Sequence, residues 1–456
     1  MTGPQDRSRR STGARRGGTL VIFGSTGNLA TTRIFPAIKT LRLKGPGGQR
    51  LLTIGVDRRA PGGEAPMPGY RFLRGDLRSR GTFAALGRLL RGSAGRSGSP
   101  VTFYLATGPE LFPVIVRGLT EEGLNRPGGL GGRIMVEKPF GVDLDSARTL
   151  EHALGSGFPS RGIFRVDHFL GKEGTDLIQR VRFGSPRLEK VWNRGHVDHV
   201  QILVDEGSAV GARGTFYDSA GVVRDMVQNH ILQLLCLVAM EPPVGPDPDG
   251  VARSKARVLR ALRMPDPSDV VWGQYAGYNR ADGVKRNTRT PTFVAMRVSV
   301  ENARWTGVPF YLRTGKALAR TATEVVVVFK EALPMPKVAP GVHFSLKICI
   351  DPRSRLVIGT GREERAEPRG RPGESLDEYA RLLQDAFDGD QARFVDGRFN
   401  LLAWGLVDPL IRAWEGVPLQ KPAPYATKTW GPDAAGRLIA GDGRFWRDGH
   451  REPRQS

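Results

Sequence analysis

The first third of the chain alternates short apolar runs with amphipathic stretches. The runs have the length of buried strands and lie at residues 19–23, 51–56, 101–106 and 133–136. After the first run, apolar residues recur at helical spacing, namely Ile34, Ala37, Ile38 and Leu41. Strands that alternate with helices predict βαβ units and a mostly parallel sheet. We therefore expect a Rossmann-like α/β domain for dinucleotide binding over residues 18–163.

This alternation fades beyond residue 160. Longer apolar runs at 200–204, 292–300 and 325–329 predict strands, and a long apolar stretch at 222–240 predicts a helix. The pattern is typical of an α+β domain with a large, mainly antiparallel sheet. We place this domain at residues 164–440, and the family resemblance described below implies substrate binding and dimerisation for it. The length of 456 residues agrees with two domains, because one core rarely supports so long a chain.

The two ends of the chain read differently from these domains. Residues 1–17 are rich in arginine and predict a flexible basic tail, and residues 441–456 predict a polar tail. Arg9 and Arg10 form a twin-arginine pair, but no apolar signal region of useful length follows them.

A glycine-rich loop closes the first predicted strand. Gly24 and Gly27 permit a tight turn and leave room for a pyrophosphate, while the following helix offers free N–H groups to that anion. The same spacing also fits a plain strand-to-helix turn, but the position at the end of the first strand favours dinucleotide binding. The candidate cofactor residues of this loop are Gly24, Ser25, Thr26, Gly27, Asn28 and Leu29.

The second predicted strand ends in residues of mixed character. Asp57 suits the ribose 2′-hydroxyl of NAD, whereas Arg58 and Arg59 suit the 2′-phosphate of NADP. We favour NADP on the two arginines and leave NAD open.

Charge and cysteine usage limit the classes of partner. The formal charge of +22 favours polyanions, which include nucleic acids, dinucleotides and phosphorylated metabolites. No basic stripe is interleaved with stacking aromatic residues, so we expect no specific nucleic-acid partner. Cys236 and Cys349 lie far apart in apolar surroundings, which fits a reducing, cytoplasmic location. No apolar run approaches the ~20 residues of a membrane span, so we expect no membrane partner.

The boundary between the predicted domains carries Arg165-Val-Asp-His-Phe-Leu-Gly-Lys-Glu173. If a helix begins here, His168 and Lys172 are i, i+4 neighbours and form a phosphate clamp. A buried structural cluster is the alternative.

The apolar helix predicted at 222–240 has one polar face. At about 100° per residue its polar residues form an arc of ~140°; they are Asp225, Asn229, His230 and Gln233. Such an arc needs either protein partners or a ligand, and both interpretations stay open.

Four ordered motifs resemble the successive signatures of glucose-6-phosphate dehydrogenase. They are Glu137-Lys-Pro-Phe-Gly141, Arg165–Glu173, Asp225-Met-Val-Gln-Asn-His230 and Pro309-Phe-Tyr-Leu-Arg-Thr-Gly-Lys316. Weaker similarities are the glycine loop, Trp192-Asn-Arg, Tyr379-Ala-Arg-Leu-Leu and Trp430-Gly-Pro. The similarity runs from about residue 19 to 435. It implies oxidation of D-glucose 6-phosphate to 6-phospho-D-glucono-1,5-lactone with NADP, the first step of the oxidative pentose phosphate pathway, by a homodimer or homotetramer.

The resemblance also implies residue roles. His230 would be the base that takes the proton from the C1 hydroxyl, and Asp167 would orient it; imidazole suits this work because its pKa lies near neutrality. The implied substrate residues are His168 and Lys172 for the phosphate, Glu206, Asp225 and Lys316 for the sugar, and Lys138 between substrate and cofactor. The other implied cofactor residues are Arg58, Asp76 and Leu77. No metal is implied, and His196, Asp198 and His199 more simply line a sheet or a subunit contact.

Several positions depart from the family pattern. Phe169 replaces the usual tyrosine, and the loss of a hydrogen bond to a charged group costs roughly 1.5–3 kcal/mol. Thr321 stands where a second basic residue is usual, beside Arg320. The other departures are Asn28, Thr31, Thr32 and Gly108-Pro109. These motivate two alternatives: a dehydrogenase for a related sugar or with NAD, and a catalytically weakened regulatory homologue.

Overall fold

The computed structural model forms two compact units. It describes residues 18–44, 51–62, 65–94, 100–126, 131–243, 248–330, 344–359, 364–368, 376–417 and 421–448. The N-terminal unit comprises 1–140, 149–166 and 376–394, and the C-terminal unit comprises 141–148, 167–375 and 395–456. The predicted basic tail at 1–17 lies outside the described residues. No helix of the described part is long and apolar enough to cross a membrane.

The N-terminal unit is built on a parallel sheet. Its described strands have the order β3-β2-β1-β4-β5-β6. Their bounds are β1 (Thr19–Phe23), β2 (Leu52–Asp57), β3 (Tyr70–Arg74), β4 (Val101–Leu105), β5 (Gly131–Glu137) and β6 (Ile163–Val166). This is the Rossmann-type order. Successive strands are added to one side of β1 up to β3 and to its other side from β4 onward, and a dinucleotide binds at this switch point between β1 and β4. The predicted α/β fold is confirmed.

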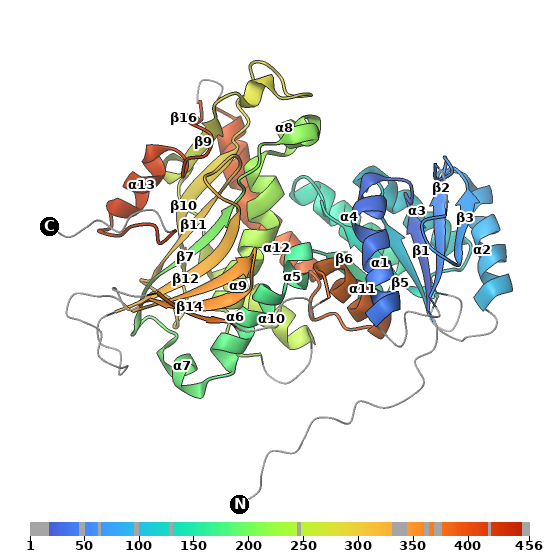
Figure 1. Ribbon diagram of the computed structural model, residues 1–456, viewed down its shortest axis with the longest axis horizontal. Helices are drawn as coiled ribbons and strands as arrows, with labels where there is room; N and C mark the ends of the chain where they lie inside the picture. Colours follow the sequence, from blue (N-terminus) through green and yellow to red (C-terminus); the bar gives the residue numbers. More distant parts are fainter. Residues whose placement is uncertain are drawn as a thin grey trace, which may run out of the picture. The chain divides into compact units, whose positions relative to one another are not determined.

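Helices pack along this sheet (Figure 1). They are η1 (Ala30–Ile34), α1 (Phe35–Lys44), α2 (Arg80–Ala94), η3 (Pro109–Leu111), α3 (Phe112–Glu121), η4 (Ser160–Gly162) and most of α4 (Leu144–Gly157). Apolar residues at 34, 37, 38 and 41 are buried in one core cluster, as their helical spacing predicts.

A helix from late in the chain completes the N-terminal unit. The apolar face of α11 (Glu378–Asp388) packs into the core cluster that contains α1, and Phe394 contacts Phe164 of β6 with ring centroids 4.8 Å apart. Arg133 of β5 donates to the carbonyl of Ala386 at 2.9 Å. The sequence-based boundaries placed this segment in the second domain, because an amphipathic pattern shows that a face is buried but not which partner buries it.

The C-terminal unit is built on a mixed sheet. Its described strands run β15-β14-β13-β12-β7-β11-β10-β9-β16, with β8 beside β10. Their bounds are β7 (Val197–Asp205), β8 (Leu262–Arg263), β9 (Val271–Tyr275), β10 (Phe293–Val300), β11 (Pro309–Gly315), β12 (Ala322–Phe329), β13 (Ser345–Asp351), β14 (Arg355–Gly359), β15 (Glu364–Pro368) and β16 (Ala423–Tyr425). Neighbours are antiparallel except β7–β11 and β9–β16. The predicted α+β domain is confirmed, with these parallel pairs as an addition.

Helices α6, α9 and α12 lie on one side of the sheet, and α13 lies on the other (Figure 1). The longer helices are α6 (Glu173–Phe183), α8 (Gly214–Val222), η6 (Val223–Ile231), α9 (Leu232–Ala239), α10 (Pro248–Ala261), α12 (Gly397–Glu415) and α13 (Asp433–Ala440). The shorter ones are α5 (His168–Gly171), α7 (Pro186–Val191), η5 (Gly211–Arg213), η7 (Pro267–Asp269) and η8 (Tyr278–Arg280).

The beginning of the predicted polar tail is packed against the sheet. Arg313 of β11 is fully buried between the carboxylates of Asp205 and Asp448, each 2.6 Å away. The Trp446 ring lies 5.0 Å from the same guanidinium, and its indole N–H donates to the carbonyl of Ala435. Residues 441–448 are thus part of the fold, which their polar composition hid, because a buried arginine on a distant strand is their partner.

Candidate active site

The centre of the site is a buried pair of side chains, Asp167 and His230. Asp167 follows β6 and caps α5, where its Oδ1 accepts the backbone N–H of Phe169 at 3.0 Å. The same oxygen lies 2.6 Å from Nδ1 of His230, and each side chain is only 1% exposed. A carboxylate at Nδ1 favours the tautomer that carries its proton there, which leaves the lone pair on Nε2. The pair can therefore work as an oriented general base.

Two aromatic rings enclose His230. The Phe169 ring stacks on the imidazole at 3.9 Å and 16°, and the His168 ring meets it edge-on at 4.9 Å. Phe169, noted in the sequence for the hydroxyl it lacks, thus serves as a stacking surface for the candidate base. Its ring restricts both the orientation of the imidazole and the access of water.

The helix that carries His230 is not a regular α-helix. Residues Val223–Ile231 form a π-helix, in which residue i bonds to residue i+5. Asp225 and His230 are five residues apart and so share one face, whereas α-helical spacing sets them about 140° apart. The helix predicted at 222–240 is confirmed as a helix, but the α-helical spacing of about 100° per residue expected for it is wrong over residues 223–231. π-turns of this kind are frequent at functional sites.

Only part of the predicted polar arc faces the site. The Asn229 amide donates to the Arg224 carbonyl at 3.1 Å, and Gln233 accepts from the buried Lys255 ammonium at 2.8 Å. For these two residues the alternative of protein partners is the correct one.

A second group of charges joins Lys316, Glu206 and Asp225. Lys316 Nζ lies 2.5 Å from Glu206 Oε2 and 3.5 Å from Asp225 Oδ2. Glu206 follows β7 and Lys316 follows β11, and these strands are parallel neighbours, so their carboxyl ends meet. The structure thus brings together three residues that the resemblance assigned to the sugar. Their oxygens and ammonium suit sugar hydroxyls as hydrogen-bond partners.

The predicted helical clamp of His168 and Lys172 has a different geometry. Lys172 has extended backbone (φ −69°, ψ 138°) and separates α5 from α6, so the i, i+4 relation is wrong. Both side chains nevertheless lie near Phe169, the His168 ring at 5.0 Å and Lys172 Nζ at 5.0 Å from its ring centroid. Lys172 Nζ also lies 3.2 Å from Asp351 Oδ2. Asp351 was missed because nothing in the sequence joins the end of β13 to this loop.

The glycine loop of the N-terminal unit lies at the carboxyl end of β1. Gly24 has φ +78°, and a Cβ there would lie 2.5 Å from the Ala106 carbonyl oxygen, so a side chain is excluded. Thr26 donates through its backbone N–H and hydroxyl to Asp57 Oδ2 at 3.1 and 2.8 Å. Asp57 Oδ1 accepts the N–H of Arg58 at 2.7 Å. Asp57 therefore fixes the loop to the end of β2.

A cavity of about 320 Å³ adjoins this loop. It is lined by Ser25, Thr26, Thr31, Phe35, Pro36, Lys39, Pro61, Gly62 and Pro66. Arg58 and Arg59 are exposed at the end of β2, and among the described residues no ion pair involves them. Asp76 caps the turn after β3 by accepting the N–H of Arg78, and Leu77 is buried. Gly27, Asn28 and Leu29 lead into the first helix.

Lys138 follows β5 in the same unit. Parallel strands end on one edge of their sheet, so Lys138 lies on the edge that also carries the glycine loop. The candidate cofactor residues therefore collect where a Rossmann-type sheet binds its dinucleotide.

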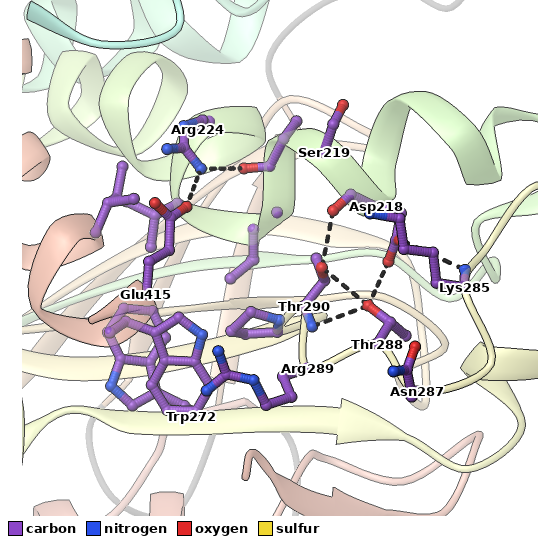
Figure 2. Close-up of a pocket in the computed structure, with 17 residues that line it drawn as sticks. Asp218, Ser219, Arg224, Trp272, Lys285, Asn287, Thr288, Arg289, Thr290 and Glu415 are labelled. Atoms are coloured by element: carbon purple, nitrogen blue, oxygen red, sulfur yellow. Dashed lines mark hydrogen bonds and ion pairs between the residues drawn. The ribbon is translucent and has the colours of Figure 1, made fainter. Parts of the chain in front are cut away.

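A different cavity, of about 240 Å³, lies in the C-terminal unit (Figure 2). Arg224, Trp272, Thr290 and Glu415 are among its walls, and Arg224 pairs with Glu415 at 2.8 Å. None of the candidate catalytic or sugar-binding residues lines it. It is separate from the site around His230.

Two further sequence features find protein partners. His199 lies 2.6 Å from Asp198 and 2.9 Å from the Gln201 amide, and all three residues belong to β7. Arg320 pairs with Glu324 at 2.6 Å, and the hydroxyl of Thr321 accepts the N–H of Gly207. The charge of Arg320 is thus already neutralised by a buried carboxylate.

Comparisons with known proteins give matches over most of the chain. The family model described as glucose-6-phosphate dehydrogenase, NAD binding domain, matches residues 64–176, and the model of the C-terminal domain matches residues 179–447. A glucose-6-phosphate 1-dehydrogenase of Mycolicibacterium smegmatis is 36% identical, with 94% of this chain and 97% of the relative covered.

Two solved structures are similar over almost their whole length. The Mycobacterium avium glucose-6-phosphate 1-dehydrogenase has a TM-score of 0.82 at 32% identity and covers 96% of this chain and 100% of its own. A glucose-6-phosphate dehydrogenase in complex with its substrate glucose-6-phosphate has a TM-score of 0.84 at 29% identity, with 96% and 99% covered.

The buried Lys255, which donates a hydrogen bond to Gln233, leads to a prediction of how stability depends on pH. Burial lowers the pKa of its ammonium to about 8 in the folded protein, against about 10.4 in an unfolded chain. Between these values the unfolded chain binds the proton that the native protein has lost, so this lysine makes stability rise with pH. We expect the unfolding free energy of the protein, relative to that of Lys255→Met, to rise by up to about 3 kcal/mol from pH 8 to 10.4. Urea unfolding at several pH values measures this difference, and a difference independent of pH contradicts it.

Proposed function

The chain belongs to the glucose-6-phosphate dehydrogenase family, and we propose that it oxidises D-glucose 6-phosphate at C1 to 6-phospho-D-glucono-1,5-lactone with NADP. This reaction opens the oxidative pentose phosphate pathway. The observation that carries the proposal is the buried contact between Asp167 and His230, 2.6 Å long. It supplies an oriented base in a place that excludes water.

The proton movement follows from the geometry of this pair. Nε2 of His230 takes the proton of the C1 hydroxyl while the C1–H bond breaks and the lactone carbonyl forms. Asp167 stabilises the imidazolium that results, because its carboxylate faces Nδ1. When bound, the nicotinamide cofactor supplies the acceptor for the hydride.

The sugar is held at both of its ends. Glu206, Asp225 and Lys316 bind hydroxyl groups, since their charges meet at the ends of β7 and β11. His168 and Lys172, which both lie beside Phe169, bind the 6-phosphate. Lys138, which follows β5 at the edge of the dinucleotide-binding sheet, is assigned to the substrate and to the cofactor.

The residues of the N-terminal unit fit a dinucleotide. The missing Cβ of Gly24 leaves its backbone accessible, and the loop that follows leads into a helix whose N–H groups suit a pyrophosphate. Loop residues Gly24–Leu29 hold this group, and Asp76 and Leu77 contact the adenine side.

We assign NADP rather than NAD from the state of Asp57. Both of its carboxylate oxygens accept hydrogen bonds from the protein itself, from Thr26 and from the N–H of Arg58. It is thus poorly placed to accept the ribose hydroxyls of NAD. The exposed Arg58 and Arg59, which form no ion pair among the described residues, offer positive charge to a 2′-phosphate.

The remaining proposals concern location and assembly. Cys236 and Cys349 are buried free thiols, which suits a reducing cytoplasm. The broad sheet of the C-terminal unit offers a surface for a homodimer or homotetramer.

The assignment of the base is tested by kinetics of single variants. We expect His230→Ala and Asp167→Asn to lower kcat with glucose 6-phosphate and NADP by about 10²–10⁴-fold, because the proton acceptor or its orientation is lost. Reduction of NADP followed at 340 nm measures this. His152→Ala, an exposed histidine of α4, is the matched control and should retain full turnover. Unchanged turnover in His230→Ala would rule out the assigned base, and a wild type that binds but never reduces NADP would favour the regulatory alternative.

The choice of cofactor is tested at Arg58. We expect Arg58→Ala to raise KM for NADP about 10- to 100-fold, which corresponds to a lost charged hydrogen bond of roughly 1.5–3 kcal/mol, and to leave KM for NAD unchanged. Arg88→Ala, an exposed arginine of α2, is the control. Equal effects of Arg58→Ala on both cofactors would contradict the assignment.

A further inference from the structure

The phosphate subsite contains a carboxylate in contact with its own lysine. Lys172 Nζ lies 3.2 Å from Asp351 Oδ2, and the two side chains are 16% and 33% exposed. Lys172 comes from the junction of α5 and α6, and Asp351 is the last residue of β13. The lysine that is to receive an anionic ligand is therefore already paired with an anion of the protein.

The fold holds these two residues together. A Cβ on Gly174 would lie 2.4 Å from the Cα of Ile350, so only glycine lets the first turn of α6 lie against the end of β13. The N–H of Lys172 donates to the Phe169 carbonyl at 3.1 Å and so fixes the junction from the other side. The pair of Lys172 and Asp351 is a consequence of this backbone packing rather than of two mobile surface side chains.

Lys172 also lies beside the aromatic ring of Phe169. Its ammonium lies 5.0 Å from the centroid of the Phe169 ring, whose edge and face carry no hydroxyl to bind a phosphate. His168, beside the same ring, is the other cationic candidate of the subsite. A phosphoryl group that reaches Lys172 must therefore approach a carboxylate as well, and like charges at such distances repel measurably even at high effective dielectric constant.

We propose that Asp351 competes with the phosphoryl group of the substrate for Lys172 and thereby sets how strongly this site prefers a phosphorylated sugar to a neutral one. The proposal rests on the proposed function of the site. Asp351 acts on the affinity for the phosphate ester and not on the proton transfer, which takes place at His230. A sugar without the phosphate leaves the pair of Lys172 and Asp351 intact, so the pair does not change the affinity for that sugar.

The test removes one charge and keeps the shape. We expect Asp351→Asn to raise kcat/KM for glucose 6-phosphate about tenfold, as a lower KM with little change in kcat. We expect kcat/KM for free glucose to stay the same, and the gain with the phosphate ester to shrink at high salt because screening weakens the repulsion. Glu173→Gln is the matched control, since this neighbouring carboxylate is directed to Arg180 at 3.9 Å; it should change kcat/KM less than twofold.

Calorimetric titration with glucose 6-phosphate, carried out in parallel, measures binding independently of turnover. Tighter binding by Asp351→Asn supports the proposal even in a protein without turnover, whereas absent turnover in the wild type refutes the proposed function alone. Unchanged or weaker binding of glucose 6-phosphate by Asp351→Asn overturns the proposal, as does an equal gain for free glucose. Asp351→Ser, which also removes the charge, replaces Asp351→Asn if that variant does not fold.

Discussion

The contact between Asp167 and His230 is the constraint on which the rest of the site depends. Both side chains are almost completely buried, and a buried carboxylate is tolerated only where partners compensate its lost hydration. Those partners come from two directions, the N–H of Phe169 on α5 and the imidazole on η6. The π-helical turn then places Asp225 on the same face as His230, so the proposed base and one of the three proposed sugar-binding charges share one helix.

The charges of the site are arranged as ion-paired groups rather than as a positive patch. Lys316 lies between two carboxylates, Lys172 contacts Asp351, and Arg320 is held by Glu324. The formal charge of +22 therefore says little about the site itself. Selectivity for an anionic substrate depends on how much positive charge of each cation its carboxylate partner leaves unneutralised. A single carboxylate such as Asp351 can therefore change this selectivity.

Much of the dinucleotide-binding unit could be predicted because its signals are local. The apolar runs alternate with helices, and Gly24 and Arg58 directly follow strands. Because β1 and β2 are parallel, both residues lie at the same edge of the sheet. Glu206 and Lys316 were assigned by resemblance, and the pairing of β7 with β11 explains their contact.

The features that escaped prediction depend on partners distant in sequence or on helix geometry. Asp351 is 179 positions from Lys172, and α11 lies within the sequence range predicted for the second domain but packs in the N-terminal unit. Asp448 is bound by Arg313 on the central sheet. The π-turn at 223–231 could not be seen from residue types whose periodicity fits an ordinary helix.

The most direct test of the account is a crystal structure of the protein with glucose 6-phosphate bound. The account predicts that the C1 hydroxyl oxygen lies about 2.6–3.2 Å from Nε2 of His230, with the phosphate beside His168 and Lys172. A sugar bound in the opposite direction, with its phosphate at Lys316 and C1 far from His230, would contradict it.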